Sequence, residues 1–431
     1  MRLEIIALPQ SPANLENNSI KRILVVAESI DVEDSSGTKG RVALIKNLHK
    51  AGFELQVYHY TRNDIDLPGI PCFHIKENRR SFLFFLSRLE RYIRYWLKIN
   101  PNKLIENLFG FSFTLFNDRN SIVAGLKKVR GFEPDLVLTL SKGASFRPHH
   151  ALLKLPKWHS KWMAYIHDPY PMHSYPRPYD WVEPGHQQKR KFFLRVAAKA
   201  RYAAYPSILL AEWMQSYYGE LKGKTVIIPH QIDEDEMELP ALPNFFKKEA
   251  FTIVHAGALM GARNPMGLIR AFKKFLKEMP EAIPESQLIF LGAKSGYTRE
   301  FEEIKKEIPQ FYSSDDYLPF KQVQAIQKNA AVNVILEAKG PISPFLPGKF
   351  PHCIDAEKPI LLLGPYYSES RRLLGEDYPW WSEINDEEKI FMIIKELYHN
   401  WKSNQNQLDY NYSELKTYLS VEYLESQFSV L

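Results

Sequence analysis

The chain has 431 residues, of which 45% are hydrophobic and 25% are charged, and these values exclude an intrinsically disordered or fibrous protein. At roughly 100–200 residues per domain, this length predicts two domains. No stretch reaches the ~18 consecutive apolar residues of a membrane-spanning helix, and the apolar run near the N-terminus is too short for a secretory signal. We therefore expect an intracellular, cytoplasmic protein.

The formal net charge of +6 hides a difference between the two halves. Residues 1–230 contain 34 Lys and Arg against 20 Asp and Glu, whereas residues 231–431 contain 22 against 30. A basic half can attract phosphates, anionic lipid surfaces or nucleic acid, while an acidic half is usually a solvated surface. This asymmetry supports a domain boundary near residue 230.

The two cysteines do not suggest a metal site or a disulfide framework. Cys72 and Cys353 are far apart in sequence and lack metal-ligand spacing. We expect both to be reduced and structural.

Strand-like and helical segments alternate through the first half. Residues 22–27 form a continuous apolar run typical of a strand buried on both faces. A polar loop is expected over residues 28–40, followed by a helix over 41–50 that ends at Gly52. Further strands are predicted at 54–60, 135–140, 162–166, 206–210 and 225–228.

A second series of strands follows an acidic, proline-containing segment that reads as a linker. A helix is predicted over 265–278, and the last 40 residues are helical in pattern. Because several strands end at or near a glycine, we expect doubly wound sheets that bind ligands at the carboxyl ends of their strands. The predicted strands of this half are residues 251–255, 287–291, 331–336 and 359–363.

The predicted fold class is therefore α/β, with two Rossmann-like doubly wound parallel-sheet domains. We expect a first domain over residues 1–230, a linker over 231–250 and a second domain over 251–405. Residues 406–431 would form a C-terminal helical segment, and one hypothesis is that it packs back on the first domain.

Two loops combine glycines with a following helix. In the first, Gly37, Thr38 and Gly40 would offer backbone amides and a helix N-terminus to a phosphate, although a plain turn explains the sequence equally well. The second begins at Gly257 and contains Arg263 just before the next helix. That arginine could make a bidentate contact to a diphosphate, or it could simply be solvated.

The loop over residues 339–349 is the most specific of these signals. It is rich in proline and glycine, it contains Ser343 and Gly348, and it ends at Lys349 where a helix begins. Such rigidity leaves backbone donors free, and a purely structural loop has little need for so many constrained residues.

A titratable pair, His167 and Asp168, ends the predicted strand over 162–166 and precedes a loop rich in aromatic residues and proline. That position suits catalysis or contact with a sugar, on whose faces aromatic rings can stack. The alternative is a histidine with all its hydrogen bonds satisfied in the core.

Taken together, these segments resemble the glycosyltransferases of the B-type fold (GT-B), close to the large nucleotide-sugar-dependent family 4-like (group 1) enzymes of bacterial cell-surface polysaccharide synthesis. Residues 253–272 resemble the opening of that family's donor domain, and residues 226–233 resemble the signature that ends its first domain. Residues 344–359 resemble the segment that lines the nucleotide-sugar pocket.

This last segment departs from the family pattern. The family's ribose-binding glutamate falls on His352, and Pro344 stands where another carboxylate often lies. Three explanations stay open: His352 and the nearby Asp355 have taken over the ribose contact, the donor specificity has changed, or activity has been lost.

The resemblance implies a glycosyltransferase of cell-surface glycan or glycoconjugate synthesis whose acceptor, lipid-linked or other, binds the first domain and whose nucleotide sugar binds the second. Arg263 and Lys349 would neutralise the leaving diphosphate without a metal ion or other cofactor. The loop around Gly37 and Gly40 would approach the same phosphates. His167 would contact substrate.

The resemblance also limits the role of Asp168, which would be a general base only in an inverting enzyme, whereas members of this fold mostly retain configuration. The rival from another class is a non-catalytic nucleotide-sugar-binding or scaffold protein. A nucleotide-sugar epimerase of the same fold is a third option, but its expected carboxylate-rich site is not apparent in the sequence.

Residues 79–98 predict a basic amphipathic helix. Its polar face carries Arg88, Arg91, Arg94 and Lys98. We weigh peripheral attachment to an anionic membrane, at its inner face, against a core helix with a solvated polar face. Nucleic acid is not expected as a partner, because the second half is acidic and no recognised binding motif is present. The apolar face comprises Phe82, Leu86, Leu89, Ile93, Trp96 and Leu97.

Overall fold

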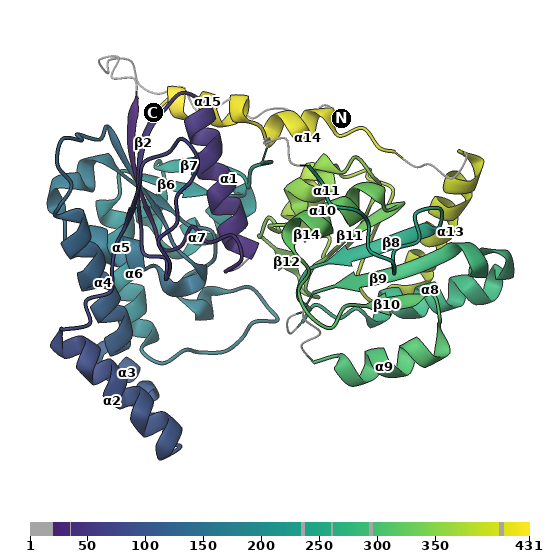
Figure 1. The fold of residues 1–431 in the computed structure, drawn as a ribbon, viewed down its shortest axis with the longest axis horizontal. Coiled ribbons are helices and arrows are strands. Elements are labelled where there is room, and N and C mark those ends of the chain that lie inside the picture. Colours follow the sequence, from purple (N-terminus) through teal and green to yellow (C-terminus); the bar gives the residue numbers. More distant parts are fainter. Residues whose placement is uncertain (1–19, 35, 234–237, 260–261, 293–295, 405–408) are drawn as a thin grey trace.

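The computed structural model describes residues 20–34, 36–233, 238–259, 262–292, 296–404 and 409–431 (Figure 1). Parts of several predicted segments lie outside the described residues. They are residues 1–19 of the first domain, residue 35 of the loop predicted over 28–40, 234–237 of the linker, 260–261, 293–295 and 405 of the second domain, and 406–408 of the C-terminal segment.

The first domain is built on a seven-stranded parallel sheet in the order β3-β2-β1-β4-β5-β6-β7. Neighbouring residues along β1 face opposite sides of the sheet and enter two separate apolar cores, as a strand covered on both faces requires. The strands are β1 (Arg22–Ala27), β2 (Glu54–His59), β3 (Cys72–His74), β4 (Leu136–Leu140), β5 (Trp162–Tyr165), β6 (Tyr202–Tyr205) and β7 (Thr225–Ile227).

The second domain has a six-stranded parallel sheet in the order β10-β9-β8-β11-β13-β15, and a two-stranded sheet pairs β12 with β14. The predicted α/β class with two Rossmann-like domains is confirmed. The strands are β8 (Phe251–Ala256), β9 (Ser286–Leu291), β10 (Phe311–Ser313), β11 (Val332–Leu336), β12 (Ile342–Ser343), β13 (Ile360–Leu363), β14 (Tyr367–Ser368) and β15 (Trp381–Ser382).

Helices cover both faces of each sheet (Figure 1). In the first domain they are α1 (Ser36–Lys50), α2 (Phe82–Trp96), α3 (Asn102–Phe109), α4 (Phe113–Leu126), α5 (Arg147–Leu152), α6 (His186–Lys199) and α7 (Ile208–Tyr217). In the second they are α8 (Met266–Glu278), α9 (Thr298–Glu307), α10 (Phe320–Asn329), α11 (Phe350–Asp355), α12 (Glu369–Leu374) and α13 (Glu387–Ser403).

The chain returns to the first domain at its end. Helices α14 (Ser413–Tyr418) and α15 (Val421–Ser429) run along one edge of the molecule, and α15 packs on α1 (Figure 1). Leu424 and Phe428 are buried in the core that also contains residues of α1 and β1. The two domains are therefore linked through the C-terminal helices as well as through residues 228–250.

Three predictions about local structure are wrong. Residues 206–210 are not a strand: Ser207 caps α7, its side chain accepting a hydrogen bond from the Leu210 amide, and the strand is the preceding Tyr202–Tyr205. The loop predicted to end at Gly40 is shorter, since α1 begins at Ser36. The core-helix alternative for residues 79–98 fails because the only buried residues of α2 are Ser87 and Glu90. Both cysteines are free, as expected.

Candidate functional site

The candidate site begins where β8 and β9 end. Gly257 and Gly292 follow these neighbouring strands, and both have positive φ angles, 140° and 126°. A Cβ on Gly292 would lie 2.9 Å from the Gly257 carbonyl carbon, so a side chain there would collide with the backbone. The two glycines let the chain turn sharply at this edge and leave room for the side chain of Lys349.

Lys349 precedes α11 and reaches back to the end of β8. Its Nζ lies 2.8 Å from Nε2 of His255, and a Cβ on Gly257 would lie 3.2 Å from the same Nζ. Burial and the charge of Arg263 lower the Lys349 pKa to about 7. His255 is itself buried, and burial together with the two cations holds its pKa well below the usual range, so its ring is neutral and accepts a hydrogen bond from Lys349.

Arg263 is half-buried beside Lys349. Its charge also lowers the pKa values of His255 and Glu337 in its own domain and of Asp168 in the first domain. Within the described part of the chain, Arg263 makes no hydrogen bond and no ion pair. Two adjacent cations without a bound carboxylate form a place where an anion is electrostatically favoured.

Glu337 follows β11 and is 3% exposed. Its Oε1 accepts a hydrogen bond from Ser370 at 2.7 Å, and the hydroxyl groups of Ser368 and Ser343 also lower its pKa. Burial raises its pKa to about 7 against the opposing effects of these hydroxyls and of Arg263. Ser343, a predicted donor-binding residue, therefore lies buried beside Glu337.

The first domain presents His167 and Asp168 directly after β5. Burial raises the Asp168 pKa to about 7, although Tyr175, Arg263 and Arg41 oppose the shift. Burial and the charge of Arg41 hold the His167 pKa well below its usual value. Both predicted residues follow β5, and the charge of Arg263 lowers the pKa of Asp168 as well as that of Lys349.

Arg41 in α1 is the central cation of this edge. Its Nη1 donates to the Ser141 carbonyl at 2.9 Å and its Nη2 to the Thr38 hydroxyl at 2.6 Å. Burial lowers its pKa to about 10. Thr38 is fully buried against this arginine, whereas Gly37 is exposed in the same first turn.

The same N-terminal part of α1 meets the pocket segment of the second domain. Lys39 Nζ lies 4.3 Å from the Phe320 ring centre, and that ring packs edge-on against His352 at 4.9 Å. A Cβ on Gly40 would lie 3.3 Å from Nδ1 of His230. Burial lowers the pKa of both His230 and His352 to about 4. Two cations of α1 contribute to this shift, Arg41 at His230 and Lys39 at His352.

Two predicted residues lie apart from this cluster. Asp355 pairs with Lys328 on α10 at 3.0 Å, on the same domain. Gly348 is exposed in the turn before Lys349.

Sequence reasoning missed Arg41, His255 and Glu337 as site residues. His255 and Glu337 carried a usable signal, because each is a polar residue at the end of an otherwise apolar strand. The sequence pattern places Arg41 at the start of a helix, whereas α1 begins five residues earlier, so the burial of Arg41 against the end of β4 could not be inferred.

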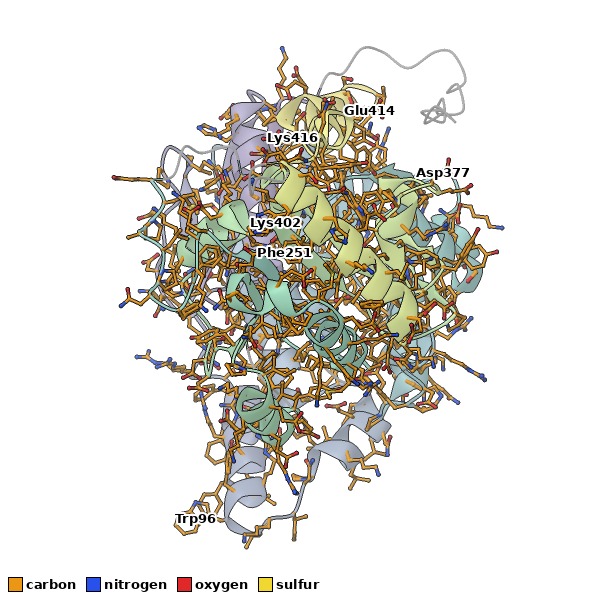
Figure 2. The ribbon with its side chains drawn as sticks, turned by 90° about the vertical axis from the view of Figure 1, so that its right-hand side faces the viewer. Trp96, Phe251, Asp377, Lys402, Glu414 and Lys416 are labelled. Carbon is orange, nitrogen blue, oxygen red and sulfur yellow. The ribbon has the colours of Figure 1, made fainter. Side chains whose placement is uncertain are left out.

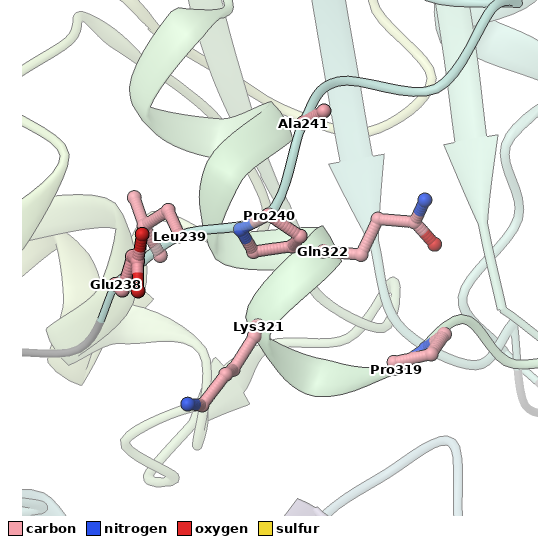
Figure 3. A pocket seen from close by; sticks show the side chains of 7 residues that line it. All are labelled: Glu238, Leu239, Pro240, Ala241, Pro319, Lys321 and Gln322. Atoms are coloured by element: carbon pink, nitrogen blue, oxygen red, sulfur yellow. The ribbon is translucent and has the colours of Figure 1, made fainter.

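A separate hollow of about 630 Å³ lies between the interdomain connection and the start of α10 (Figure 3). None of its lining residues belongs to the cluster around Lys349. They are Glu238, Leu239, Pro240, Ala241, Pro319, Lys321 and Gln322.

Neither protein-family models nor curated protein sequences match the chain. Solved structures do match it. A UDP-forming α,α-trehalose-phosphate synthase from Burkholderia vietnamiensis aligns with a TM-score of 0.61 at 10% identity, over 95% of this chain and 96% of that chain. The N-terminal domain of Candida albicans trehalose-6-phosphate phosphatase gives 0.61 at 13% identity, over 98% of both chains.

A third structure, trehalose-6-phosphate from E. coli bound with UDP-2-fluoro glucose, aligns with a TM-score of 0.60 at 10% identity, over 95% of this chain and 99% of that chain. The chain has the GT-B fold. At these identities the likeness concerns the fold, so the GT-B resemblance seen in the sequence is confirmed, and membership of family 4 stays a prediction.

Proposed function

We propose that this GT-B protein is a glycosyltransferase that moves a hexosyl group from a nucleotide sugar to an acceptor. The observation that carries the proposal is that Lys349 lies at Gly257 within the influence of the Arg263 charge, and that neither side chain forms an ion pair with a described residue. A half-buried cation next to another cation is costly in the empty protein. The cost is recovered when a diphosphate occupies the site.

In this reaction the bond between the sugar C1 and the diphosphate oxygen breaks, and the electron pair stays on that oxygen. The acceptor hydroxyl oxygen bonds to C1 and loses its proton. Arg263 and Lys349 stabilise the charge that develops on the leaving diphosphate, the role for which many enzymes use a metal ion. We propose that the two side chains are sufficient for it.

The donor that fits this proposal best is a UDP sugar. The Burkholderia synthase is described as UDP-forming, and the E. coli structure is bound with UDP-2-fluoro glucose. His352 takes the ribose contact, because it lies near Lys39 and Phe320 on the side of the first domain, whereas Asp355 is held by Lys328.

We assign His167 and Asp168 to the transferred sugar, with retention of configuration. In that case the acceptor proton passes to the leaving diphosphate, and Asp168 acts as a hydrogen-bond partner of a sugar hydroxyl. The acceptor lies on the basic first domain and belongs to cell-surface glycan or glycoconjugate synthesis.

The test is a screen of the purified full chain against UDP, GDP, dTDP, ADP and CMP with their common sugar conjugates, read as a shift of the melting temperature. The best ligand then enters an assay that detects released nucleoside diphosphate in the presence of candidate acceptors. Stabilisation with turnover supports the proposal. Stabilisation without turnover supports the non-catalytic alternative, and no stabilisation by any conjugate overturns both.

A further inference from the structure

Helices α2 and α3 project from the body of the first domain, at the opposite edge from α14 and α15 (Figure 1). Trp96, the last residue of α2, lies at the far end of this projection (Figure 2). None of the described helices combines the length and the apolar composition that crossing a bilayer requires.

The residues of α2 that are buried on the domain are polar. They are Ser87 and Glu90, while Leu83, Leu86 and Ile93 are half-buried, and the helix contacts α4. The N-cap residue Ser81 donates a hydrogen bond to Asn117 of α4 at 2.5 Å. A surface helix usually buries its apolar residues instead.

Helix α3 is attached in the same way. It has no buried residue, and Glu106 forms an ion pair with Lys189 of α6 at 3.0 Å. Asn107 accepts a hydrogen bond from the Gly185 amide at 3.2 Å. A Cβ on Gly185 would lie only 2.1 Å from the Glu106 carbonyl oxygen, so α3 rests directly on the start of α6.

The outward side of the two helices is apolar, and we call it the α2–α3 apolar face. Trp96 is 74% exposed and Phe82 is 73% exposed. So large a set of contiguous exposed apolar side chains is uncommon on a soluble domain and marks an interaction surface. The face comprises Phe82, Phe85, Leu89, Tyr92, Tyr95, Trp96, Leu97, Ile99, Leu104, Leu108 and Phe109.

Positive charge surrounds this face. Residues 79–109 contain seven Lys and Arg against two carboxylates, and two of the seven, Arg79 and Arg88, pair with Glu77. The two carboxylates, Glu90 and Glu106, are on the sides that contact the domain: Glu90 is buried and Glu106 is paired with Lys189. A second copy of this chain would bring the same cations together, whereas an anionic surface would neutralise them.

We propose that the α2–α3 apolar face inserts into the interfacial region of an anionic phospholipid bilayer. The aliphatic and aromatic side chains enter the boundary of the acyl chains, Tyr and Trp remain at the headgroup level, and the basic side chains contact lipid phosphates. This proposal does not depend on the proposed transferase activity, because its test involves neither donor nor acceptor.

The experiment is flotation of the full chain with vesicles of pure phosphatidylcholine and with vesicles that also contain phosphatidylglycerol. The protein should float with the anionic vesicles at low salt and be released at high salt. A Phe85→Ser/Trp96→Ser variant and a Lys98→Glu/Lys103→Glu variant should each bind about tenfold more weakly or worse.

Matched controls alter exposed residues elsewhere. Tyr317→Ser removes an aromatic ring that is 69% exposed, and Lys248→Glu/Lys306→Glu reverses two exposed charges, one in the linker and one in the second domain. Both should bind like the wild type. Absence of flotation, binding that ignores lipid charge and salt, or equal weakening by the controls would overturn the proposal. If the wild type did not bind vesicles but sedimented as a dimer, and Phe85→Ser/Trp96→Ser sedimented as a monomer, the face would be assigned to a second copy of the chain.

Discussion

The two domains each hold a partly buried cation at the carboxyl edge of their sheet, but they neutralise it differently. In the first domain, Arg147 pairs with Glu28 and Asp118 at 2.7 Å each, and although burial lowers its pKa, these carboxylates raise it overall. In the second, Lys349 contacts neutral His255 beside Arg263, and its pKa falls to about 7. A cation paired with two carboxylates stabilises the folded domain, whereas a cation beside another cation is available to bind an anionic ligand.

The largest effect is expected on stability, when Arg147 is replaced. Arg147→Met leaves the Glu28 and Asp118 carboxylates without their cation, so it should lower the free energy of unfolding of the first domain by about 3–5 kcal/mol. Urea unfolding followed by tryptophan fluorescence measures this loss. Adding Glu28→Gln and Asp118→Asn should restore much of it. If Arg147→Met alone were as stable as the wild type, the ion pairs of Arg147 would not contribute to the stability of the fold.

Lys349→Met should show the opposite behaviour. It removes a charge that has no ion-pair partner, so the stability of the empty protein should be unchanged or slightly increased. Turnover should fall by more than about tenfold, because one cation is lost from the developing diphosphate. Steady-state kinetics on the donor found by the nucleotide screen, with urea unfolding as the control, separates the two outcomes. Unchanged turnover would remove Lys349 from the site.

The pH dependence of nucleoside diphosphate affinity should sharpen the comparison. Lys349 loses its proton above a pKa of about 7, and Asp168 and Glu337 gain negative charge over the same range, so affinity should fall as the pH rises from 6 to 9, by about tenfold per unit at most. Lys349→Met should flatten this profile in calorimetric titrations. A variant profile as steep as that of the wild type would exclude Lys349 as the main cause.

The same lysine affects the stability of the empty protein. Its native pKa is lowered from 10.5 to about 7. Between these values the unfolded chain holds a proton that the native lysine has released, so its contribution makes the protein more stable as the pH rises through this range.

The smallest effect is expected at the contact between the domains. Ser207 caps α7 and also donates to the Pro344 carbonyl of the other domain at 2.6 Å. Ser207→Ala should cost about 1 kcal/mol of stability, as should Ser112→Ala, which removes the cap of α4 within the first domain alone. Only Ser207→Ala should also change donor affinity, because it alters how the domains meet. Equal donor affinities in the two variants would contradict that role.

Much of the fold could be predicted because buried parallel strands are continuous apolar runs. The resemblance to GT-B enzymes implied that Arg263 and Lys349 act on one diphosphate although 86 positions separate them, and loops after neighbouring parallel strands do meet at one edge. The prediction of strands from apolar runs failed at residues 206–210, where such a run follows a capping serine and begins a helix. It also missed Glu337 and Arg41, whose roles depend on which side chains pack beside them.

Helix periodicity has a further limit, shown by α2 and α8. Both helices have one strongly apolar face, and in α8 that face is buried in the core of the second domain, with Leu268, Phe272 and Phe275 fully inaccessible. In α2 large apolar residues such as Phe82 and Trp96 are exposed, and the buried residues, Ser87 and Glu90, are polar. The pattern reveals which side is apolar, but only the packing reveals which side faces the protein.

The central claim is that Arg263 and Lys349 hold the diphosphate of the donor. The most direct measurement is a calorimetric titration of the stabilising nucleoside diphosphate into the wild type and into the Arg263→Met/Lys349→Met variant, with melting curves to confirm that both are folded. We expect the variant to bind at least about a hundredfold more weakly, since two charge-assisted contacts are lost. Equal affinities, or no binding to the folded wild type, would contradict the claim.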